Sequence, residues 1–347
     1  MTIERTTIRE GYSISNIIKG SWHLAGGHGS INERDAIADM RSFVEAGITT
    51  FDCADIYTGV EELIGKFLRE HKDAISSGAL SPVQVHTKYV PDYDALSSLT
   101  FSDTRKIIER SLMRLGVDQL DLVQFAWWSY EFPGYVETAM HLKRLQKEGK
   151  IRLIGVTNFD SVRLNEILDA GVSVATNQVQ YSVLDHRPAH DVHANESDIP
   201  FLCYGSVAGG FLSDKYLGAP DPKSPLENRS LVKYRLIIDE FGGYEYFQKA
   251  LRTLREIADK HQVDIAEVAI RYVLQREKVG AAIVGARSKA HIHKLQKIST
   301  FKLDADDLSA IKKLVDNSKG PSGPVYELER DKNGKHGSIM RYNLSDK

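Results

Sequence analysis

The stretches Asp52-Cys53-Ala54-Asp55-Ile56-Tyr57 and Val85-His86-Thr87-Lys88 decide the fold of this chain. Each continues a short run of β-branched and apolar residues, at 47–51 and 83–85, that follows a segment with helical periodicity. The polar residues therefore end two successive strands, and in a parallel barrel such ends face the same rim. A carboxylate, a phenol and an ammonium at one rim form a set of groups suited to donating a proton.

Strand-like and helical segments alternate along the rest of the chain. The eight predicted strands lie at 14–18, 49–52, 83–87, 121–125, 153–157, 174–178, 200–204 and 281–285. Alternation over this length indicates either a parallel barrel or an open doubly wound sheet. The glycine turn at 26–29 lacks the spacing of the dinucleotide fingerprint of an open sheet. We therefore predict an α/β fold, a (β/α)8 TIM-type barrel.

Composition indicates one large domain and a small-molecule partner. The chain has 347 residues, of which 42% are hydrophobic, and this suits a single barrel with insertions. Its 45 basic and 47 acidic residues give a net charge of -2, which provides no global field for nucleic acid or an anionic membrane. These features carry no signal for the oligomeric state.

Cysteine and histidine usage points to a reducing compartment and to no metal. Cys53 and Cys203 lie far apart, each in an apolar strand-like stretch, so neither a disulfide framework nor a zinc spacing can be built. His186, His190 and His193 lie close together in sequence, and we interpret them as surface loop residues. The first twenty residues lack the apolar core of a signal peptide, and the chain has no apolar run of membrane length. We expect a cytoplasmic protein.

Two segments depart from a minimal barrel. The polar, proline-containing stretch 213–230 predicts a long loop after the seventh strand. The sequence Gly320-Pro321-Ser322-Gly323-Pro324 predicts a hinge before a charged tail. We therefore expect a barrel domain over 1–319 and a tail over 320–347 that packs across the mouth of the pocket.

The ordered motifs resemble those of the aldo-keto reductases over residues 14–318. The resemblance rests on Asp52 and Tyr57, on Lys88, and on three further motifs, Gly155-Val156-Thr157-Asn158-Phe159, Asn177-Gln178 and Gly285-Ala286-Arg287-Ser288. It implies an (α/β)8 barrel that binds a nicotinamide cofactor in extended form. A structural ion pair at the rim beside an ordinary core tyrosine is the alternative interpretation of these residues.

The resemblance implies a division of labour among three residues. Asp52 would hold Lys88 by an ion pair, and Tyr57 would give its proton to a carbonyl oxygen while the cofactor delivers hydride to the carbon. A phenol with a pKa of about 10 is a weak acid at neutral pH unless a cation stabilises the phenolate. Lys88 is the expected cation.

The chain departs from the family pattern at Ala126, where the family normally has a histidine. A hydrogen-bond donor lost at such a position commonly costs about 10²- to 10³-fold in rate. Three explanations stay open: an engineered replacement, a natural reductase that uses water or another donor, and a cofactor-binding protein without turnover. His336 and Tyr342 in the tail are our candidates for a substitute donor.

Cofactor residues follow from the same resemblance. Thr157, Asn158 and Gln178 are expected to bind the carboxamide, and Tyr204 to stack on the nicotinamide ring. The loop that includes Gly205, Ser206 and Leu212 would approach the pyrophosphate. Gly285, Arg287, Ser288 and His291 belong to the segment that would hold the adenosine phosphate, and the guanidinium of Arg287 favours NADPH over NADH.

The expected substrate pocket is aromatic. Trp22, Trp127 and Trp128 would line its rim, which suits a flat or apolar carbonyl compound, although large aromatic residues are equally common as core packing. The leading hypothesis is an NADPH-dependent aldehyde or ketone reductase that is reversible as an alcohol dehydrogenase. An NADP(H)-binding regulatory barrel protein is the alternative that Ala126 keeps open.

Overall fold

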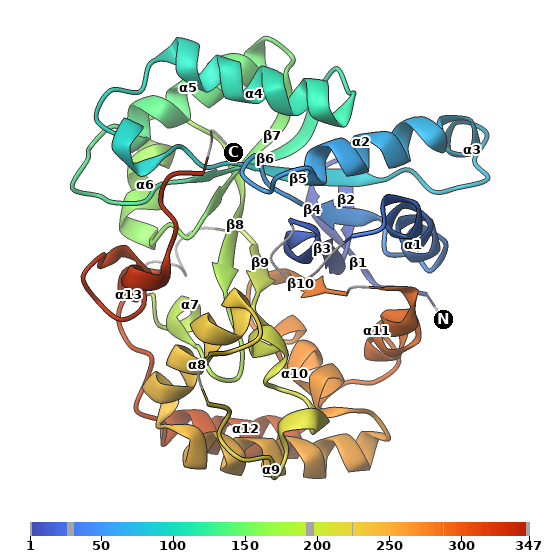
Figure 1. Cartoon of the computed structure of the whole chain (residues 1–347), viewed down its shortest axis with the longest axis vertical. Helices are drawn as coiled ribbons and strands as arrows, with labels where there is room; N and C mark the ends of the chain where they lie inside the picture. Colours follow the sequence, from blue (N-terminus) through green and yellow to red (C-terminus); the bar gives the residue numbers. More distant parts are fainter. Residues whose placement is uncertain (1, 26–30, 192–197, 224, 287, 345–347) are drawn as a thin grey trace.

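A closed parallel barrel organises the molecule (Figure 1). The computed structural model describes residues 2–25, 31–191, 198–223, 225–286 and 288–344, and in that part of the chain eight strands pair in the order β10-β3-β4-β5-β6-β7-β8-β9. The barrel strands are β3 (Ile17–Gly20), β4 (Thr50–Asp52), β5 (Gln84–Tyr89), β6 (Leu120–Ala126), β7 (Ile151–Thr157), β8 (Val174–Gln180), β9 (Phe201–Tyr204) and β10 (Val279–Gly285). The predicted (β/α)8 barrel is confirmed.

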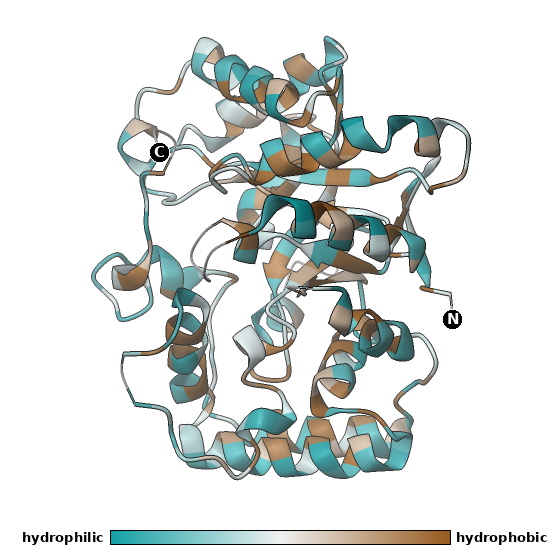
Figure 2. Ribbon diagram, turned by 45° about the vertical axis from the view of Figure 1, so that its right-hand side comes forward, coloured by the Kyte–Doolittle hydropathy of each residue, from teal (hydrophilic) through white to brown (hydrophobic). Residues whose placement is uncertain are grey.

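Helices cover the outside of the barrel and turn their hydrophobic stripes toward the strands (Figure 2). The α-helices are α1 (Glu33–Glu45), α2 (Val60–Glu70), α3 (Lys72–Ser76), α4 (Phe101–Leu115), α5 (Tyr135–Lys147), α6 (Ser161–Asp169), α7 (Arg187–His190), α8 (Arg229–Phe241), α9 (Tyr244–His261), α10 (Ile265–Leu274), α11 (Ile292–Ile298), α12 (Ala305–Asp316) and α13 (Glu327–Arg330). Short 3-10 turns are η1 (Trp22–Leu24), η2 (Tyr93–Ala95), η4 (Ala208–Gly210), η5 (Asp214–Tyr216), η6 (Lys289–His291) and η7 (Gly337–Ile339). None of the described helices combines the length and the apolar character that a bilayer crossing needs.

Helix α4 shows how local sequence sets these elements. Thr100 and Asp103 form a reciprocal capping box at its start, which satisfies backbone donors that have no partner inside the helix. Ile108 and Leu115 on its inner face are 1% exposed. Gly116 ends the helix at φ 67°, a left-handed conformation that glycine adopts without steric cost.

An N-terminal hairpin closes the bottom of the barrel and corrects one predicted strand. The predicted strand at 14–18 combines the end of β2 with the start of β3, because β1 (Arg5–Arg9) and β2 (Tyr12–Ser15) pair antiparallel outside the barrel. The chain bends between β2 and β3 at Asn16, whose backbone N–H donates to the carbonyl oxygen of Glu4. Ile8 and Ile14 of the hairpin pack with barrel residues such as Leu122.

The segments predicted as loop and tail contain short helices. The stretch 213–230 includes η5 and the first residues of α8. The tail contains α13 and η7 and then returns to the barrel rim, where the backbone N–H of Tyr93 donates to the carbonyl oxygen of Tyr342 at 2.9 Å. Figure 1 shows α13 between the barrel helices and α8.

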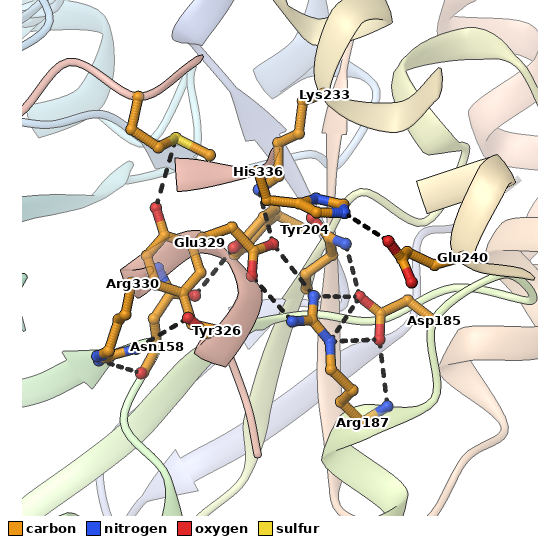
Figure 3. Close-up of polar contacts among 12 residues, drawn as sticks. Asn158, Asp185, Arg187, Tyr204, Lys233, Glu240, Tyr326, Glu329, Arg330 and His336 are labelled. Atoms are coloured by element: carbon orange, nitrogen blue, oxygen red, sulfur yellow. Dashed lines mark hydrogen bonds and ion pairs between the residues drawn. The ribbon is translucent and has the colours of Figure 1, made fainter. Parts of the chain in front are cut away.

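A buried charge cluster fastens the tail to the barrel. The guanidinium of Arg187 donates to Asp185 Oδ2 at 2.7 Å through Nη2 and to Glu329 Oε2 at 2.8 Å through Nη1 (Figure 3). All three side chains are at most 2% exposed. Charges this deeply buried are stable only when they are paired and hydrogen-bonded, so α13 has one well-defined place on the barrel.

Replacing Glu329 with Gln is expected to loosen this cluster. Burial alone would raise the pKa of Glu329, but the charges of Arg187 and Lys233 outweigh it and lower the pKa to about 2. Glu329→Gln should therefore reduce the free energy of unfolding by about 2 kcal/mol at pH 7. Because the folded-state pKa is depressed, the difference should be full above the ordinary glutamate pKa of 4.5 and shrink as the pH falls toward about 2.

Urea unfolding measured from pH 7 down to about pH 2.5 tests this expectation. Glu327→Gln is the matched control, because Glu327 lies on the same helix but is exposed. Equal stability of the two variants at pH 7 would contradict the assigned role of Glu329.

Candidate active site

A cavity of about 620 Å³ lies at the carboxyl ends of the barrel strands. Most of the predicted site residues line it: Trp22, Asp52, Tyr57, Lys88, Ala126, Trp127, Trp128, Thr157, Asn158, Gln178, Tyr204, Gly205, Ser206, Gly285 and His291. Leu212 and Ser288 do not line the cavity. Leu212 is fully buried in the core, and Ser288 is the residue before η6. Arg287 lies outside the described residues.

A buried ion pair forms the floor of the cavity. Lys88 Nζ lies 2.7 Å from Asp52 Oδ2 and 2.8 Å from the carbonyl oxygen of Cys53. The second carboxylate oxygen, Oδ1, accepts hydrogen bonds from Gln124 Nε2 at 3.1 Å and from Gln178 Nε2 at 2.7 Å. The Asp52 carboxylate thus has donors from three other strands, β5, β6 and β8, which compensates for its removal from water.

Tyr57 faces this ion pair. Lys88 Nζ lies 5.1 Å from the centroid of the Tyr57 ring. Burial raises the pKa of Tyr57 above its ordinary value, while the charge of Lys88 and its hydrogen bond to the phenol act in the opposite direction. Burial has the larger effect, so Tyr57 keeps its proton at neutral pH.

Lys88 stays protonated in the same site. Burial lowers the pKa of Lys88, but the charge and hydrogen bond of Asp52, together with smaller contributions from Tyr57 and Cys53, outweigh it, so the pKa lies above its ordinary value. The site therefore holds a neutral phenol beside a fixed positive charge. This arrangement favours transfer of the phenol proton to an oxygen that is gaining negative charge.

Aromatic rings form much of the upper wall. The Trp22 ring packs edge-on against Tyr57, with 4.8 Å between the ring centroids. The indole N–H groups of Trp127 and Trp128 donate to the carbonyl oxygens of Phe132 and Pro91, at 3.0 and 2.9 Å. These two indoles therefore offer the cavity apolar surface and not their N–H groups.

The two tail residues expected to replace a donor at Ala126 do not line the cavity. His336 is buried, with its Nε2 3.3 Å from Glu240 Oε1. The Tyr342 hydroxyl donates to the carbonyl oxygens of Gly337 and Glu329. Both expectations are wrong because contacts within the tail and with α8 occupy these side chains.

The wall beside β9 has features that suit a phosphate-bearing ligand. Ser206 is 1% exposed, and its Oγ has no hydrogen-bond partner among the residues described. Gly209 has φ 66°, and a Cβ there would lie 2.7 Å from the Tyr234 ring, so only glycine fits. The cations Arg229, Lys233 and Arg341 line the same cavity, although no local sequence pattern marks them.

Polar contacts also fix the residues expected to meet a nicotinamide. The Tyr204 hydroxyl donates to Asn158 Oδ1 at 2.9 Å, and the Thr157 hydroxyl donates to the carbonyl oxygen of Gln178 at 3.1 Å. Lys233 Nζ lies 5.0 Å from the centroid of the Tyr204 ring. Tyr204 is thus held at its hydroxyl by Asn158 and on its ring by Lys233.

The predicted histidine cluster has no place at this site. His186 is half-buried, with its ring against Tyr181 and Tyr272, and so is not the surface loop residue that we expected. His193 lies outside the described residues. Among the described residues, no group of three potential ligands is close enough to hold a metal ion.

Residues 16–316 match the model of the aldo/keto reductase family. The chain belongs to the aldo/keto reductase family. Family membership makes it an oxidoreductase of carbonyl compounds, in agreement with the phenol and lysine at the barrel rim. The cavity residues described above are therefore candidates for the active site of a reductase.

The alignments with curated relatives cover almost the whole of this reductase. It is 28% identical to the aldo-keto reductase YhdN of Bacillus subtilis, over 93% of this chain and 97% of that protein. It is 27% identical to the glyoxal reductase of the same bacterium, over 91% and 97% of the two chains. It is 25% identical to the methylglyoxal reductase YeaE of Escherichia coli, over 89% and 93%.

Solved structures share the fold of this reductase. The glycerol dehydrogenase of Gluconobacter oxydans superposes with a TM-score of 0.75 at 22% identity, over 92% of this chain and 98% of that one. An aldo/keto reductase of Klebsiella pneumoniae, solved with NADP and acetate, gives a TM-score of 0.67 at 22% identity over 93% and 98%.

Removing one charge of the Lys88–Asp52 ion pair should reduce the free energy of unfolding more than removing both charges. Asp52→Asn leaves Lys88 buried without a counter-ion and should reduce the free energy of unfolding by about 3 kcal/mol. Adding Lys88→Met should recover at least about 1 kcal/mol, because no unpaired charge then remains. Urea unfolding of the two single variants and the double variant measures this coupling. Strictly additive losses would show that the two side chains are not energetically coupled.

Proposed function

We propose that this protein is an NADPH-dependent oxidoreductase that reduces an aldehyde or ketone to an alcohol and also catalyses the reverse reaction. The observation that carries the proposal is the contact of Lys88 with both Asp52 and Tyr57. A purely structural ion pair would need no phenol beside it. Here the phenol and the ammonium line one cavity in a member of a carbonyl reductase family.

Each residue of this set has a separate task. Tyr57 donates its proton to the substrate oxygen as the carbonyl is reduced, and Lys88 stabilises the phenolate that remains. Asp52 keeps Lys88 protonated and in place. In the reverse direction the phenolate accepts the proton of an alcohol. A reduced nicotinamide, when bound, supplies the hydride.

The residues around the cavity fit a phosphate-bearing nicotinamide. Ser206 offers a buried hydroxyl without a partner among the described residues. Besides the Lys88–Asp52 pair, the cavity is lined in the described part of the chain by three cations, Arg229, Lys233 and Arg341, and by one acid, Glu227. Thr157, Asn158, Gln178 and Tyr204 would hold the nicotinamide end. Gly205 and Ser206 would hold the pyrophosphate, and Gly285 and His291 would lie toward the adenosine end. We favour NADPH over NADH because the extra phosphate adds negative charge to complement this lining.

The tail is proposed to cover the cavity mouth. Tyr326, Ile339, Met340, Arg341 and Leu344 line the cavity. The described part of the tail, 320–344, would therefore exclude water and shape the substrate pocket together with Trp22 and Trp128. An aromatic wall favours flat or apolar carbonyl compounds.

Loss of the Tyr57 hydroxyl should abolish turnover without abolishing cofactor binding. In Tyr57→Phe, kcat/KM should fall by at least about 10²-fold, because the proton donor is removed. The measurement is NADPH oxidation with a panel of carbonyl compounds that includes methylglyoxal and glyoxal, beside an NADPH titration by fluorescence. Tyr246→Phe is the control, because the Tyr246 hydroxyl donates to the carbonyl oxygen of Leu314 outside the cavity. Tight NADPH binding by the parent protein without oxidation by any carbonyl would favour the regulatory alternative.

The hydroxyl of Ser206 should contribute to cofactor affinity. Ser206→Ala should raise the Kd for NADPH about tenfold, since a hydrogen bond to a charged phosphate is lost. Fluorescence titration measures the change. Ser111→Ala is the matched control, because Ser111 also has a buried Oγ without a partner among the described residues but lies outside the cavity. An unchanged Kd in Ser206→Ala would remove Ser206 from the phosphate site.

A further inference from the structure

Tyr326 stands at the point where the tail reaches the cavity. It is the residue before α13 and adopts φ 64° and ψ 15°, a left-handed conformation that is strained for an aromatic residue. Such conformations persist only when the surrounding structure holds them, and they concentrate at functional sites. Its side chain is 9% exposed and lines the same cavity as Tyr57 and Ala126.

Arg330 fastens this part of the tail to the ends of two barrel strands. Its Nη2 donates to the carbonyl oxygen of Trp127, just beyond β6, at 3.2 Å. It also donates to the carbonyl oxygen of Asn158, just beyond β7, at 2.8 Å (Figure 3). Its backbone N–H donates to the carbonyl oxygen of Tyr326 at 3.2 Å. Trp127 directly follows Ala126, so these bonds tie Tyr326 to the strand end that carries Ala126.

Cations on α8 and α13 hold the Tyr326 ring. Lys233 Nζ lies 5.5 Å from the ring centroid, and the Arg330 guanidinium carbon lies 5.3 Å from it. Lys233 in turn lies 3.8 Å from Glu329, the residue that Arg187 anchors. The ring is therefore held by two half-buried cations, one paired with Glu329 and the other hydrogen-bonded to backbone carbonyl oxygens.

The Tyr326 hydroxyl has no strong acceptor of its own. Within the described ranges its hydrogen-bond contact is Met340 Sδ, at 3.9 Å, and a thioether sulfur is a weak acceptor. Burial raises the pKa of Tyr326, and the charge of Glu329 adds to this effect, so the hydroxyl keeps its proton. A buried hydroxyl whose contact is a weak sulfur acceptor can donate its hydrogen bond to a ligand instead.

A carbonyl oxygen that becomes an alkoxide can accept more than one hydrogen bond, and each donor aimed at it lowers the barrier. Tyr57 supplies one donor. The Ala126 methyl supplies none, and the indole N–H groups of Trp127 and Trp128 are bound to backbone carbonyl oxygens.

We propose that Tyr326 is the second hydrogen-bond donor to the substrate oxygen, so that the tail contributes a catalytic residue to the barrel. This inference rests on the proposed carbonyl reduction. Tyr326 keeps its proton throughout, and the transferred proton comes from Tyr57.

Tyr326→Phe removes the hydroxyl and keeps the ring. We expect kcat to fall at least tenfold, with KM changed less and the Kd for NADPH unchanged. Tyr342→Phe is the matched control, because the Tyr342 hydroxyl belongs to the same tail but donates to backbone carbonyl oxygens. We expect its kcat to stay within about twofold of the parent, and thermal unfolding of both variants verifies that they are folded. A kcat for Tyr326→Phe within twofold of the parent would overturn the inference.

Ala126→His provides an independent test at another position that lines the same cavity. Added to Tyr326→Phe, it should restore most of the lost kcat, since it returns a donor to the site. In the parent protein it should change kcat less than about threefold, because the second donor is already present. A gain of 10²-fold or more in the parent would show that no second donor exists and would overturn the inference.

A binding measurement separates this inference from the proposed function. If the parent protein oxidises NADPH with no carbonyl in the panel, the proposed function fails. Acetate titrated against the complex of protein and NADP+ then probes the oxygen site through tryptophan fluorescence, since Trp22 and Trp128 line the cavity. Weaker acetate binding by Tyr326→Phe than by the parent supports the donor role of Tyr326, and equal binding overturns it.

Discussion

The buried pairing of Lys88 with Asp52 is the constraint on which the site depends. An ammonium and a carboxylate removed from water are stable only in close, well-bonded geometry. Here Gln124 and Gln178 reach across the barrel to the same carboxylate, so four strands must keep their register for the pair to persist. Because the phenol of Tyr57 lies against this pair, the barrel framework sets both the position and the protonation of the proton donor.

A second buried cluster plays the corresponding role for the tail. Arg187 joins Asp185, in the segment after β8, to Glu329 in α13, more than one hundred residues later in the chain. This bond fixes α13 above the cavity and carries Tyr326 with it. The two clusters act on different parts of the cavity. The Lys88–Asp52 pair organises its floor within the barrel, and the Arg187 cluster holds a segment distant in sequence at its wall.

Residues at strand ends were predictable from sequence, and residues placed by long-range contacts were not. Asp52 and Lys88 follow short apolar strands, so periodicity alone located them at the rim. The strand boundary near Asn16 was mistaken because the chain turns there from the hairpin into the barrel without interrupting the apolar pattern. Tyr326 had no local signal, since buried ion pairs in other segments determine its position.

The transfer of deuterium from C4-labelled NADPH to a carbonyl carbon tests the central claim most directly. The parent protein is incubated with NADPH deuterated on either face of C4 and with the carbonyl panel, and the alcohols are analysed by mass spectrometry. Carbonyl reduction by bound NADPH predicts one deuterium on the carbinol carbon from one of the two labelled faces. Absence of labelled alcohol with every carbonyl, under conditions where NADPH is bound, would contradict carbonyl reduction at this site.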